Sequence, residues 1–213
     1  QHPIIQIMRQ TRSTGRFEFL RSSYGTSWVL VLVFTASFVI EAFGSTRLGL
    51  PHLGKILRFL IVCLVILPVW KLHRFPKSRT KMALWLWVSA WFVLLGTAAS
   101  AFCPPSLEIA GAHLAFIGGF GVMIFMISSR VTLSHGGFDL SLEATSGVYA
   151  AVGTLSVLAA ASRFGANLAG PRGYPILLSS AAVFFLLALI AWGSAFLGKA
   201  IRPLKLRHPG KAE

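Results

Sequence analysis

The segment HLAFIGGFGVMIFMISSRVTLSHGG, residues 113–137, decides the fold. No charged side chain lies between His113 and Arg130, and apolar residues alternate there with glycines. A run of this length and polarity is typical of a membrane-spanning helix. His113 and His135 are 22 positions apart, which is roughly 33 Å along a continuous helix and about one hydrocarbon thickness. The sequence therefore predicts one histidine near each membrane surface, too far apart to bind the same metal ion.

The composition supports a membrane protein throughout the chain. Its 213 residues are 55% hydrophobic and only 12% charged, about half the charged fraction of a soluble domain. The formal charge of +14 does not indicate nucleic-acid binding, because the basic residues occupy short loops between apolar runs. We therefore expect an all-α polytopic membrane protein whose surrounding partner is lipid, with no nucleic acid.

Six apolar runs are long enough to form a bundle of six transmembrane helices. They cover residues 27–43, 55–70, 82–102, 107–129, 141–161 and 174–197. Together they make a transmembrane domain of residues 27–197, between an N-terminal segment of residues 1–26 and a basic tail of residues 198–213. The short second run spans a membrane only if Lys55 and Arg58 extend toward the interface. Ser106 is the expected N-cap of the fourth helix.

The distribution of positive charge predicts the orientation of these helices. Fifteen of the 20 Lys and Arg residues fall on the side of the membrane that holds both termini. The positive-inside rule then places both termini in the cytoplasm. By depth, His52 and His113 belong to the outer half of the membrane, and His73 and His135 to the inner boundary.

The fourth predicted helix has two unlike faces. His113 shares one face with bulky residues such as Phe120 and Ile124. The opposite face carries small residues, which allow another helix to approach closely. These small-face residues are Gly111, Ala115, Gly118, Gly119 and Val122. A histidine in hydrocarbon needs a partner, so His113 either ligates a metal or haem or bonds to a backbone carbonyl or to Glu108.

The predicted depths of the histidines in the membrane allow two further ligand arrangements. His52 pairs with His113, or His73 with His135, as the two axial ligands of a haem. Arg130 lies where the helix meets water, and it acts either as an anchor at the helix exit or as a site for an anionic group such as a haem propionate.

The motif around this helix resembles a known family. His113 is followed by Gly118, Gly121 and Met123, and then by SRVTLSHGG at positions 129–137, which is similar to the signature of the NnrS family. The resemblance implies a multi-pass bacterial inner-membrane protein associated with haem and copper and linked to nitric oxide and nitrosative stress. It also implies that His113 and His135 are metal or haem ligands and that Arg130 is structural or binds a propionate. With six predicted spans, the chain resembles the carboxy-terminal half of that family.

Two functions follow as hypotheses. In the first, an NnrS-like protein binds haem or copper through axial histidine coordination, with His52 as a further metal-ligand candidate, and handles nitric oxide. In the second, the chain is a non-catalytic membrane subunit that packs against a larger respiratory or photosynthetic complex. A bound haem or copper and the absence of any cofactor are equally compatible with the sequence. No residue pattern indicates a catalytic site, and we do not expect an enzyme.

Overall fold

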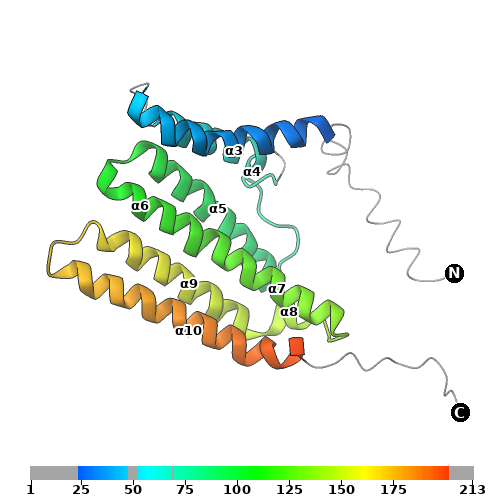
Figure 1. The fold of residues 1–213 in the computed structure, drawn as a ribbon. Helices are drawn as coiled ribbons and strands as arrows, with labels where there is room; N and C mark the ends of the chain where they lie inside the picture. Colours follow the sequence, from blue (N-terminus) through cyan, green and yellow to red (C-terminus); the bar gives the residue numbers. More distant parts are fainter. Residues whose placement is uncertain (1–23, 48–51, 69, 202–213) are drawn as a thin grey trace, which may run out of the picture. The chain divides into compact units, whose positions relative to one another are not determined.

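The described part of the chain is helical. The computed structural model describes residues 24–47, 52–68 and 70–201, and within these ranges it contains helices, turns and loops but no strand (Figure 1). The all-α prediction is therefore confirmed for them. The fold has two compact units, and the division between them falls between Lys71 and Leu72.

The first unit contains a pair of helices, α3 (Tyr24–Arg47) and α4 (Leu53–Ile66). They pack closely because Gly54 of α4 lies directly on α3, where a Cβ atom would sit 2.8 Å from the Cβ of Glu41. The second apolar run was expected to be helical to residue 70. Instead α4 ends at Ile66 after 14 residues, which is shorter than the ~20 residues needed to cross a bilayer.

The second unit contains four helices that are long and apolar enough to span a membrane. One of them is the continuous helix Pro105–His135, which consists of α6 (Pro105–His113), the π-helix η1 (Leu114–Gly121) and α7 (Val122–His135). The other elements are α5 (Lys81–Phe102), the single turn α8 (Leu142–Thr145), α9 (Gly147–Ala166) and α10 (Gly173–Ile201). In Figure 1, α5 lies beside the continuous helix, and α9 lies beside α10.

The helix predicted around residues 113–137 is confirmed as one uninterrupted element, but both of its ends differ from the prediction. It begins at Pro105 with Pro104 as N-cap, so Ser106 is not the cap. Proline suits the first helical position because the N–H that it lacks would have no partner there.

The C-terminal end of the same helix extends beyond the predicted residue 129 to His135. There Gly137 adopts a left-handed φ of 66°, and the Phe138 N–H donates to the Leu133 carbonyl over 2.9 Å. This is a Schellman motif, which needs a residue without steric penalty at positive φ. Arg130 and His135 consequently lie on a helix and not in a loop.

The predicted small face is confirmed as the packing face. Its five residues are all buried, whereas Phe120, Ile124 and Ile127 on the opposite face are exposed. Gly118 lies against the ring of Phe92, and Gly119 lies against Val93 of the same α5 helix. Close backbone approach at small residues is how helices associate in lipid.

The glycine contact makes a testable prediction. A Cβ on Gly96 of α5 would lie 2.6 Å from the Gly111 carbonyl oxygen, so Gly96→Ala forces the two helices apart. We expect a loss of about 1–3 kcal/mol in stability, typical of overpacking, measured by thermal unfolding in detergent. Gly198→Ala is the matched control, because outside the local backbone of its own helix no atom lies within 4 Å of a Cβ on Gly198. Equal effects of the two substitutions would contradict the packing.

Candidate functional site

The helical structure is interrupted before α9, and this interruption places an acidic side chain inside the second unit. The fifth span was predicted to begin at Ser141 without interruption, and this is wrong. Ser146 is extended, with φ −65° and ψ 131°, and its side chain caps α9 by accepting from the Val148 N–H over 3.3 Å. The preceding turn α8 thus runs separately from α9, and it buries Glu143, which is only 6% exposed.

The turn before α8 is fixed by Asp139. Its carboxylate accepts hydrogen bonds from the side chain of Ser141 at 2.5 Å and from the Ser141 backbone N–H at 2.8 Å. These bonds favour the charged form and lower the pKa of Asp139 below its usual value. On the other side of α8, Lys81 Nζ of α5 donates to the Thr145 carbonyl at 3.0 Å. The position of Glu143 is therefore set from both sides.

Glu143 forms an ion pair with Arg130. The Arg130 Nη1 atom lies 3.2 Å from Glu143 Oε2, and the Arg130 side chain is 56% exposed. The other carboxylate oxygen, Oε1, is buried and has no hydrogen-bond partner among the described residues. Arg130 was expected to anchor the helix exit or to bind an anionic group, and in the structure its carboxylate partner belongs to the protein itself.

A second polar group lies next to this pair. Ser129, which is buried, donates to the Phe125 carbonyl at 2.6 Å and accepts from the Trp192 indole Nε1 at 2.9 Å. This links α7 to α10. Tyr149 is 1% exposed, its side chain lies near the Ser129 hydroxyl, and it is within range of the charge on Glu143. Its hydroxyl, however, makes no hydrogen bond to any described residue.

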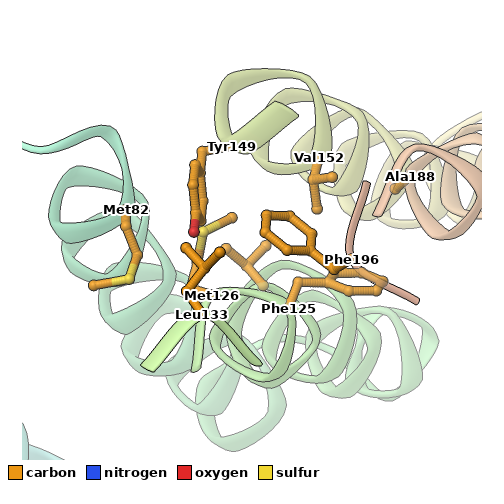
Figure 2. Packing of buried hydrophobic residues seen from close by; sticks show 9 residues of the cluster. Met82, Phe125, Met126, Leu133, Tyr149, Val152, Ala188 and Phe196 are labelled. Carbon is orange, nitrogen blue, oxygen red and sulfur yellow. The ribbon is translucent and has the colours of Figure 1, made fainter. Parts of the chain in front are cut away.

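Apolar side chains surround these polar groups. Figure 2 shows the ring of Tyr149 extending from α9 toward Met126 of α7, beside Met82 of α5 and Phe196 of α10. The Tyr149 and Phe196 rings lie 5.7 Å apart. Tyr149 therefore belongs to the hydrophobic core of the second unit, where unpaired polar atoms are costly.

The two histidines of the long helix each have one nitrogen available. His113 Nδ1 lies 2.7 Å from the Ile109 carbonyl, and His135 Nδ1 lies 3.1 Å from the Val131 carbonyl. A carbonyl oxygen only accepts, so in the neutral rings Nδ1 carries the hydrogen and Nε2 keeps its lone pair. Metal-ligating histidines commonly have this arrangement. His113 is half-buried and directly precedes η1, whereas His135 is exposed.

A family model described as "NnrS protein" matches residues 6–203. The chain belongs to the NnrS family. The resemblance seen in the sequence is thus confirmed over almost the whole chain. No curated protein and no solved structure matches it.

The three candidate histidine ligands occupy separate positions in this structure. His113 and His135 lie at opposite ends of one stretch of helix, and His52 lies at the N-cap of α4 in the first unit. Across residues 24–47, 52–68 and 70–201, no group of three or more His, Cys, Asp or Glu side chains is placed to hold a metal ion. Each of these three histidines is therefore a potential ligand at its own position, outside any such group of side chains.

The first unit contains another charged cluster that the sequence did not indicate. Lys55 and Arg58 were expected to extend toward the interface, but both turn toward Glu41 of α3. Arg58 pairs with the Glu41 carboxylate and lies 4.1 Å from the centre of the Phe38 ring, while Lys55 Nζ is 3.8 Å from Glu41 Oε1. The cluster carries two cations for one carboxylate and holds the α3–α4 pair together.

The hydrogen bond between Ser129 and Trp192 in this NnrS chain can be tested by substituting two adjacent serines and comparing the effects. Ser129→Ala removes the acceptor for Trp192 and leaves the indole N–H unpaired, which we expect to cost about 1–3 kcal/mol. Ser128 also bonds to the carbonyl four residues before it, but the hydrogen bonds of its side chain in the described structure all stay within its own helix. Ser128→Ala should therefore change stability by less than about 0.5 kcal/mol. Thermal unfolding followed by tryptophan fluorescence measures both, and indistinguishable values would contradict the assigned role.

Proposed function

We propose that this NnrS-family protein resides in the bacterial inner membrane with six spans and both termini in the cytoplasm. The four long helices of the second unit supply four of these spans. The α3–α4 pair supplies the other two, with the bilayer locally thinned around the short helix α4, so that the transmembrane domain covers residues 27–197 and corresponds to the carboxy-terminal half of longer family members. The ion pairs of Glu41 with Lys55 and Arg58 reduce the cost of placing these charges in lipid.

Within this scaffold we propose that His113 is an axial haem ligand. The observation that carries the proposal is the orientation of its ring, because the Ile109 carbonyl holds Nδ1 and leaves Nε2 free. The face of the helix around it is apolar and exposed in the second unit, as shown by Phe116 and Phe120. Such a surface suits a porphyrin. The π-helix that begins at the next residue is also a common feature of functional sites.

The available donors favour haem over copper. A haem iron receives four nitrogens from the porphyrin and needs only one or two protein ligands. Protein copper sites are built mainly from several side chains such as His, Cys and Met, and the described residues place no group of three His, Cys, Asp or Glu side chains together. His135 is a second, separate candidate ligand. Arg130 remains available to a propionate through the exposed part of its guanidinium, while Glu143 holds the other part.

When bound, haem would supply an iron centre able to bind nitric oxide, which connects the proposal to the nitrosative-stress response that the family resemblance implies. The chain's own contribution is to orient His113, since the Ile109 carbonyl fixes the ring and increases the basicity of Nε2. The apolar face would exclude water from the ligand. Binding nitric oxide at such an iron needs no acid–base group from the protein. The proposed role is therefore ligand binding and not hydrolysis.

A second candidate function is a non-catalytic subunit of a larger respiratory or photosynthetic complex. It is favoured by the exposed apolar stripe along the helix Pro105–His135, which the second unit leaves uncovered. This stripe includes Ile109, Phe116, Phe120, Ile124, Ile127 and Val131. In that case the stripe packs against another membrane protein and His113 has a structural role.

The haem proposal is tested by the optical spectrum of the purified protein. We expect a Soret band and a positive pyridine haemochrome assay, and His113→Ala should lose the haem bound at this position, because the substitution removes the axial nitrogen. His135→Ala shows whether a second haem is present. Ser194→Ala, which removes a hydroxyl bonded within α10, is the control and should keep the full spectrum. A colourless protein that copurifies in a fixed ratio with a larger complex would support the second function instead.

A further inference from the structure

The loop before α5 carries three exposed cations without a counter-charge. This basic loop, residues 72–80, contains Arg74, Lys77 and Arg79, and all three side chains are exposed. No hydrogen bond or ion pair joins their charged groups to any residue that the structure describes. Neither the loop nor the following helix α5 contains an acidic residue. The surface of the loop is therefore complementary to a negatively charged ligand.

The same loop is held against α5 by contacts at both of its ends. Leu72 is only 2% exposed, and its carbonyl accepts a hydrogen bond from the Trp87 indole Nε1 at 2.8 Å. The ring of Phe75 lies 5.4 Å from the ring of Trp87. At the other end, the Thr80 side chain caps α5 by accepting from the Ala83 N–H at 3.2 Å. The three cations are therefore presented from a defined position.

The contact with Trp87 places the basic loop at the depth of the lipid headgroups. Helix α5 is one of the four candidate spans, and Trp87 lies seven positions after its cap Thr80, which is about 10 Å along the helix. Tryptophans near the ends of spans lie at the headgroup level. Phe75 is 62% exposed beside the cations. An apolar ring next to basic side chains suits a membrane surface better than a soluble acidic partner.

We propose that the basic loop binds the headgroups of anionic phospholipids. Arg74, Lys77 and Arg79 contact the phosphates, and Phe75 enters the boundary between headgroups and acyl chains. A guanidinium can donate two parallel hydrogen bonds to one phosphate group. A zwitterionic lipid carries the same phosphate, but its own ammonium group cancels the charge, so the loop favours anionic lipid. This surface is separate from His113 and from the exposed stripe on the helix Pro105–His135.

The preference can be measured with the full chain in bilayers that contain spin-labelled lipid. Electron paramagnetic resonance gives the association constant of phosphatidylglycerol relative to phosphatidylcholine, and we expect a ratio above one. The double variant Arg74→Gln/Arg79→Gln should lower this ratio by about fivefold or more. The double variant Arg163→Gln/Arg172→Gln removes the same charge from the loop region between α9 and α10 and should leave the ratio nearly unchanged.

A second pair of variants changes the position of the loop without changing its charge. Trp87→Phe removes the hydrogen bond to the Leu72 carbonyl and should lower the preference for phosphatidylglycerol. Trp91→Phe is the control, because the Trp91 indole makes no hydrogen bond to a described residue.

Three results would overturn the proposal: no preference for phosphatidylglycerol in the unaltered chain, equal effects of the two arginine pairs, or an acidic protein that copurifies with the unaltered chain and is lost with Arg74 and Arg79. The measurement needs no haem, so it is independent of the Soret experiment.

Discussion

The second unit depends on the close approach of α5 to the small-residue face of the helix Pro105–His135. In lipid the hydrophobic effect does not drive helices together, so van der Waals contact between closely fitting surfaces must do so. Gly96 and Gly111 allow backbone to meet backbone, and Gly118 and Gly119 accept side chains of α5. This contact determines which face of the long helix is buried and therefore which face presents His113.

The sequence predicted the fold correctly wherever the residues of a single helix were sufficient to identify it. Length and hydropathy identified the long spans, and the positions of glycine and alanine identified the buried face of residues 107–129. The end of that helix was placed too early because Arg130 is polar, although a guanidinium is tolerated in a helix that has a carboxylate nearby. The Pro105 start was missed because Ser106 is also a good cap when considered alone.

The candidate site was much less predictable, since its residues come from different elements. The burial of Glu143 depends on the extended backbone of Ser146, and nothing in the local sequence distinguishes that residue from the other serines. The pairing of Ser129 with Trp192 joins positions 63 residues apart. The orientation of His113 was one of two alternatives that the sequence left open. Its bond to a backbone carbonyl is present, and this bond leaves the other nitrogen available, so the two alternatives do not exclude each other.

The π-helix has a consequence for how this helix tolerates insertions and deletions. Its wider turn accommodates more residues per turn than an α-helix, as if residues had been inserted within 114–121. Loss of one residue there would let the segment tighten toward α-helical geometry, and this tightening would absorb much of the rotation of about 100° that a one-residue deletion causes in a regular α-helix. Arg130 would then keep its side of the helix toward Glu143, and His113 would stay where it is. A deletion of this kind is therefore tolerated better at residues 114–121 than in the α-helical segments on either side.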